Sequence, residues 1–127
     1  MNQETGTRTP DGTPIVDWRV ARRVIPGGNE GLRGLCLMMQ EEWPRLLAQL
    51  RSALAIGDAP GARLAAHTLL GAARHFGSTP VVDAAAAIEG LAARTQLAAA
   101  SEALPLLERL GPELLAALES GPPLEEV

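Results

Sequence analysis

The sequence predicts an all-α protein: an antiparallel up-down four-helix bundle with a short N-terminal lid helix. Ala and Leu are the commonest residues, β-branched residues are few and Tyr is absent, a composition that favours helices over strands. Apolar residues recur at intervals of three and four, which is the period of one helix face. Clusters of Gly and Pro divide the chain into segments of helical length.

The first two predicted helices are indicated by a capping residue, by a cluster that ends a helix and by a segment with periodic apolar residues. Asp17 can cap a short helix that the cluster Pro26-Gly27-Gly28-Asn29 ends. Residues 30–56 then predict a long amphipathic helix, which Pro44 should kink or split.

Three more helices follow, each with its own signals. Gly57 and Asp58 form a stop and a cap, so Pro60 opens a helix that runs to about Phe76. Thr79 as cap and Pro80 at the first helical position predict a fourth helix to about Arg94. Leucines at near-heptad spacing predict the last helix, which should bend at its Gly-Pro pair: Leu104, Leu107, Leu110, Leu114 and Leu118, with Gly111-Pro112 between them.

Size and charge limit the classes of function. The chain of 127 residues fits one domain, which we expect at residues 15–120 between flexible tails at 1–14 and 121–127. No run approaches the roughly 20 apolar residues of a membrane span and no secretory signal is evident, so we expect a cytoplasmic protein without membrane insertion. The net charge of −4, without a single Lys, argues against a nucleic-acid partner. One Cys and two His predict neither a disulfide nor a metal site, and we expect no cofactor.

The third helix carries the most informative residue. On a helical wheel, one side of residues 61–76 is apolar and should face the core: Ala65, Leu69, Ala72 and Phe76. His67 falls on the opposite side. Its neighbours at helical spacing are Arg63, Leu70, Gly71 and Arg74.

This patch has the parts of a phosphoryl acceptor. Glycine inside a helix costs about 1 kcal/mol relative to alanine, so Gly71 indicates a place where another protein approaches His67. A neutral imidazole has a free ring nitrogen, and arginine holds phosphate oxygens. A solvated surface histidine between two arginines explains the same residues without any chemistry.

The residues around His67 resemble a known signature. The run Ala66-His67-Thr68-Leu69-Leu70-Gly71, with Gly77 six residues later, is similar to the His-x-Leu-Lys-Gly pattern of histidine-containing phosphotransfer (Hpt) domains. Further similarity lies in Val16-Asp17-Trp18, Glu41-Glu42-Trp43-Pro44, the segment 54–58 and Ile88-Glu89, so that about 100 residues resemble the family.

The resemblance implies a phosphorelay carrier. His67 would accept a phosphoryl group from the aspartate of a response-regulator receiver domain, or of a hybrid histidine kinase, and pass it to another receiver. Mg²⁺ would belong to the receiver. Where the family usually has Lys, this chain has Leu70; Arg74 or Arg63 could supply the charge instead, with Leu70 and Gly71 forming a receiver-docking rim.

Two other classes remain. A degenerate Hpt-like bundle would dock a receiver or a kinase without carrying phosphate, and Leu70 is the residue that raises this alternative. An independent enzyme has the least support, because no catalytic triad, phosphate-binding glycine loop or nucleotide motif is present.

Overall fold

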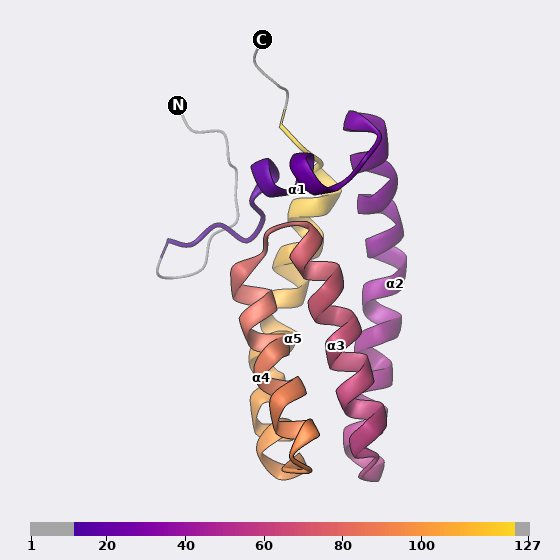
Figure 1. The fold of residues 1–127 in the computed structure, drawn as a ribbon, viewed down its shortest axis with the longest axis vertical. Coiled ribbons are helices and arrows are strands. Elements are labelled where there is room, and N and C mark those ends of the chain that lie inside the picture. The colour runs from indigo at the N-terminus through magenta and orange to yellow at the C-terminus, as the bar shows by residue number, and fades with distance from the viewer. Residues whose placement is uncertain (1–11, 124–127) are drawn as a thin grey trace.

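The computed structural model describes residues 12–123, and within them the chain forms five helices and no strand (Figure 1). The helices are α1 (Trp18–Val24), α2 (Gly28–Ile56), α3 (Ala59–His75), α4 (Thr79–Ala93) and α5 (Leu97–Ser120). The four long helices run alternately up and down, and α1 lies across one end of them (Figure 1). The predicted all-α bundle with a short N-terminal helix is therefore confirmed.

The turns between the long helices are short and well defined by sequence. Gly57 ends α2 in the left-handed conformation, with φ 76°, which glycine adopts without the steric cost of a Cβ. Asp58 then caps α3 by accepting a hydrogen bond of 3.0 Å from the backbone N–H of Gly61. This tight connection makes α2 and α3 antiparallel neighbours.

The start of α4 differs from the expectation that Thr79 is its cap. Ser78 is the N-cap residue, Thr79 is already helical, and the Ser78 side chain makes no capping hydrogen bond. The hydrogen bonds that end α3 account for this difference. The backbone N–H of Gly77 donates to the carbonyl of Arg74, and that of Ser78 donates to the carbonyl of Ala73. The whole connection is therefore only three residues long.

Proline does not divide the long helices. α2 continues through Pro44 without a break, so the expected split at this position does not occur. α5 likewise contains Pro105 and Pro112 within one helix. Each proline lacks the N–H that a helix interior would use, and packing against the other helices of the bundle keeps the segments helical.

The core runs along the whole bundle. Its largest fully buried side chains are Trp43 of α2 and Phe76 at the end of α3. Between them the core consists mostly of Leu and Ala, which matches the scarcity of aromatic residues in the chain. Trp43 packs against Gly111 of α5, where an added Cβ would lie 2.8 Å from the indole Nε1.

The short helix α1 is attached to the turn that follows α3. The backbone N–H of Asp17 donates to the carbonyl of Phe76 over 2.9 Å, and the rings of Trp18 and Phe76 meet edge to face with centroids 6.3 Å apart. Gly77 makes this approach possible, because a Cβ there would lie 2.8 Å from the Cβ of Asp17. The chain before α1 thus closes one end of the core.

The predicted tails at 1–14 and 121–127 lie largely outside the described residues. The division of the chain into tails and a domain at 15–120 stays a prediction.

Candidate functional site

His67 lies near the middle of α3 with its imidazole in solvent, since 64% of the side chain is exposed. The opposite side of the helix is buried: Ala62, Ala66, Leu69 and Ala73 have no accessible surface. Helical spacing places these residues away from position 67. The ring is therefore held on the outer face of a packed helix and is open to another molecule.

The imidazole has one fixed partner. Its Nδ1 lies 2.9 Å from Oε2 of Glu89, a residue of α4 that is 22 positions away in the chain. Only 21% of the Glu89 side chain is exposed, so the carboxylate sits in the seam between α3 and α4. This contact bridges the two helices at the surface.

The contact determines which ring nitrogen can react. A carboxylate oxygen only accepts hydrogen bonds, so Nδ1 carries the proton of the neutral ring and its N–H donates a hydrogen bond to Glu89. The other nitrogen, Nε2, then has a free lone pair. The arrangement orients an exposed imidazole and places a carboxylate beside Nδ1, where its negative charge would offset a positive charge on the ring.

Two arginines lie on the same outer face of α3. Arg63 is one turn before His67 and Arg74 is two turns after it, and both are exposed. Neither guanidinium group forms a hydrogen bond or an ion pair with another described residue, whereas Arg45 and Arg51 are paired with Glu42 and Glu108. Both guanidinium groups are thus available to an anion.

Gly71 lies one turn after His67, and nothing inside the protein requires it to be glycine. A Cβ added at this position would meet no atom within 4 Å. Its backbone has no unusual dihedral, because it lies within the regular helix α3. The absent side chain leaves open surface beside the imidazole.

The family of the chain follows from a match across this region. The model of the Hpt domain matches residues 34–121, which include His67, Glu89 and most of the bundle. The chain belongs to the Hpt domain family. Hpt domains are phosphocarriers that work with the receiver domains and kinases of two-component signalling. Comparison with curated proteins found no match, and neither did comparison with solved structures.

This Hpt domain places one predicted site residue differently from the expectation. Leu70 is only 5% exposed and belongs to the core, so the expectation that it forms part of an exposed docking rim is wrong. The physical reason is that α3 packs against both α2 and α4. Its buried side is therefore wide enough to include Leu70. Ala72, expected in the core, is only partly buried.

Glu89 is the site residue that the sequence reasoning missed. The pair Ile88-Glu89 contributed to the resemblance, but no role was assigned to the carboxylate. A signal for it was its position on α4: Ile88 is fully buried, and the next residue lies about 100° further around the helix, at the edge of the helix interface. The sequence could not show that this edge meets His67.

The described part of this Hpt domain holds no group of three or more His, Cys, Asp or Glu side chains arranged to bind a metal ion. None of the helices within residues 12–123 has the length and apolar character needed to cross a membrane.

Proposed function

We propose that this Hpt domain accepts a phosphoryl group from the aspartyl phosphate of a receiver domain on Nε2 of His67 and passes it to another receiver. The observation that carries the proposal is the hydrogen bond between Nδ1 of His67 and Glu89, which leaves Nε2 free and exposed. The alternative, a solvated surface histidine without a chemical role, does not account for a largely buried carboxylate that is hydrogen-bonded to the ring.

These groups account for each bond and each charge in the phosphoryl transfer. The bond between phosphorus and the aspartate oxygen of the receiver breaks as the bond between phosphorus and Nε2 forms, and the aspartate leaves as a carboxylate. The imidazole keeps its Nδ1 proton and gains a positive charge, which Glu89 offsets. Such a loose, in-line transfer requires mainly an aligned nucleophile and charge compensation. The reverse transfer, to a second receiver, uses the same contacts.

Arg63 and Arg74 supply the charge that the phosphoryl oxygens need. Both are exposed and have no ion pair among the described residues. This role replaces that of the lysine which the family pattern has at the position of Leu70, a side chain that lies in the core. Mg²⁺, which this chain has no group to hold within its described residues, is expected on the receiver.

Gly71 provides clearance for the partner. The position is open, and glycine there costs about 1 kcal/mol of helix stability relative to alanine. An approaching receiver surface accounts for the missing side chain.

The test is a transfer assay with purified proteins. The full chain is incubated with a panel of receiver domains from the source genome, each carrying ³²P on its aspartate. We expect acid-labile, alkali-stable label on this chain, and no label on His67→Gln. The absence of label with every receiver would overturn the proposal.

A second candidate is a bundle that docks a receiver or kinase without carrying phosphate. Its support is the apolar Leu70 in place of lysine. It predicts that a receiver binds the chain and keeps its own phosphate, in wild type and in His67→Gln alike.

A further inference from the structure

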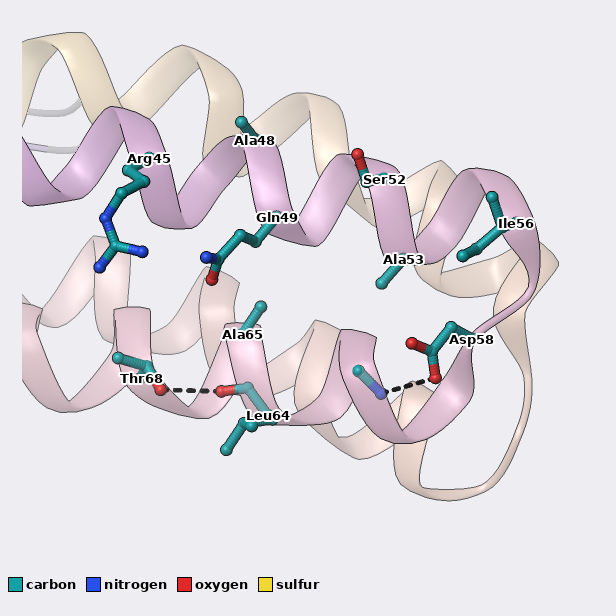
Figure 2. A pocket seen from close by; sticks show the side chains of 11 residues that line it. Arg45, Ala48, Gln49, Ser52, Ala53, Ile56, Asp58, Leu64, Ala65 and Thr68 are labelled. Atoms are coloured by element: carbon teal, nitrogen blue, oxygen red, sulfur yellow. Dashed lines mark hydrogen bonds between the residues drawn. The ribbon is translucent and has the colours of Figure 1, made fainter.

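The two ends of α3 are fixed in different ways. At its start, beside the groove between α2 and α3 that Figure 2 shows, the carboxylate of Asp58 caps the helix by accepting from the backbone N–H of Gly61. At its end, the turn to α4 has no such cap, because Ser78 makes no capping hydrogen bond. The Ser78 hydroxyl is fully buried and has no hydrogen-bond partner among the described residues. The turn of residues 76–78 therefore depends on what packs against it.

The short helix α1 and its cap supply this packing. The backbone N–H of Asp17 donates to the carbonyl of Phe76 over 2.9 Å, and the Trp18 ring meets the Phe76 ring edge to face. Gly77 lies so close to α1 that a Cβ there would be 2.9 Å from the Cβ of Val20. Residues 76 and 77 of the turn are thus both in contact with the segment at α1, which crosses this end of the bundle (Figure 1).

Arg22 in turn holds α1 in place. Its guanidinium group donates to Oδ1 of Asn29 and to the backbone carbonyl of Pro123, each over 2.6 Å. This side chain therefore ties α1 to the start of α2 and to the chain just after α5, 101 residues away. A helix of seven residues, of which only Ala21 is buried, is too short to be stable alone. The position of α1 thus depends on these attachments.

The turn that α1 covers positions the carboxylate of Glu89. α4 begins at Thr79, and a regular helix transmits a shift of its first residue along its axis, because backbone hydrogen bonds fix its rise. Oε2 of Glu89 lies 2.9 Å from Nδ1 of His67, and the side chain is only 21% exposed, so packing limits how far it can follow. A hydrogen bond is lost once the separation reaches about 3.6 Å. A displacement of α4 by about 1 Å is therefore sufficient to break this contact.

We propose that Trp18 and Arg22 are positioning residues for phosphoryl transfer. Through α1 they fix the α3–α4 turn, and the turn keeps Glu89 against Nδ1 of His67. The inference rests on the proposed function and deepens it, because it gives the N-terminal lid helix a part in controlling the acceptor ring. A lid that only covered the core would stabilise the bundle without any influence on the imidazole.

The first measurement needs no partner protein. ¹⁵N NMR of the His67 ring, at mildly alkaline pH where an imidazole is neutral, shows which nitrogen carries the proton. Trp18→Ala and Arg22→Gln should each raise the fraction protonated on Nε2, because Nδ1 loses its acceptor, and should speed amide exchange in α1 and in residues 76–79. Arg22→Lys should restore the wild-type shifts, since an ammonium group can donate to the same two oxygens. Arg23→Gln, at a neighbouring exposed arginine of α1, is the matched control and should leave the shifts unchanged.

The second measurement is transfer from the receiver that labels the wild type, over a range of receiver concentrations. Trp18→Ala and Arg22→Gln should lower the rate at saturating receiver by roughly threefold to tenfold, because misaligned groups react more slowly. The half-saturating concentration should stay that of the wild type. Adding Trp18→Ala to Glu89→Ala should cause no further loss of rate, since the contact that α1 positions is already absent. Thermal melting confirms that each variant is folded.

Three results would overturn the inference, and they are distinguishable. Unchanged ring-nitrogen shifts in both variants would show that α1 does not position His67, even where its amides exchange faster. A raised half-saturating concentration with an unchanged saturating rate would assign α1 to receiver binding. Losses that add in the double variant would show that α1 acts on the rate by a route other than Glu89. A wild type that no receiver labels would refute the proposed function instead, and the nitrogen shifts would then decide the coupling by themselves.

Discussion

Nδ1 of His67 and Oε2 of Glu89 lie 2.9 Å apart although they belong to different helices. The contact joins two helices, with the imidazole on α3 and the carboxylate that orients it on α4. This division explains why an otherwise exposed ring has a defined tautomer. It also gives the first prediction.

Glu89→Gln should lower the rate of transfer to His67 by roughly tenfold or more, because an amide provides no negative charge for the developing imidazolium. The tautomer should change as well, which ¹⁵N NMR of the ring nitrogens measures independently of any partner. Glu102→Gln, an exposed residue of α5, is the control. Wild-type nitrogen shifts and rate in Glu89→Gln would contradict the role of the carboxylate.

Replacing both Arg63 and Arg74 by alanine should slow transfer roughly a hundredfold or more and shorten the lifetime of phosphohistidine, since each charged hydrogen bond to phosphate contributes about 1.5–3 kcal/mol in favourable geometry. The single variants should show smaller losses. Arg109→Ala on α5 serves as control, because this arginine is also exposed. Unchanged rate and lifetime in the double variant would show that neither guanidinium contacts the phosphoryl group.

Two glycines of the bundle should respond oppositely to alanine. Gly71→Ala should stabilise the protein by about 0.5–1 kcal/mol, because the position is open and alanine favours helix. Gly111→Ala should destabilise it by about 1–3 kcal/mol, because the new Cβ would lie 2.8 Å from Nε1 of the buried Trp43. Urea denaturation measures both. Equal shifts of the same sign would contradict this account of the two positions.

Phe76→Ala should cost about 3–5 kcal/mol of unfolding free energy, since the ring is fully buried and packs against Trp18. Much of the effect should appear in the attachment of α1. Denaturant unfolding gives the free energy, and hydrogen exchange of the α1 amides shows whether this helix loosens. A midpoint close to that of the wild type would contradict the packing described.

Stability should fall at alkaline pH because of Cys36. Burial raises the pKa of this thiol above its ordinary value, so the unfolded chain loses the proton first as pH rises. The stabilisation is complete below the unfolded-state pKa and is lost as pH rises through the folded-state pKa. Cys36→Ala should remove this part of the pH dependence, as measured by denaturant unfolding from neutral to alkaline pH. An identical pH profile in the variant would contradict it.

The helix boundaries were largely predictable because Gly, Pro and Asp set them through local backbone chemistry. Gly57 and Asp58 act within a few residues of their own positions, so no knowledge of the rest of the fold is required. The outward position of His67 also followed from spacing along one helix. Leu70 and Glu89 differ, because their surroundings depend on which helices flank α3 and at what height. Periodicity locates a polar side of a helix, but only packing between helices shows how wide the buried side is.

The three-residue connection between α3 and α4 has a consequence for any redesign or natural variation of this bundle. It sets the vertical alignment of the two helices, and so whether a carboxylate at position 89 stands level with the ring at position 67. One inserted amino acid there would displace α4 by a fraction of a turn and uncouple the pair while leaving both side chains in place. The length of this loop therefore determines the contact between His67 and Glu89 as much as the two side chains do.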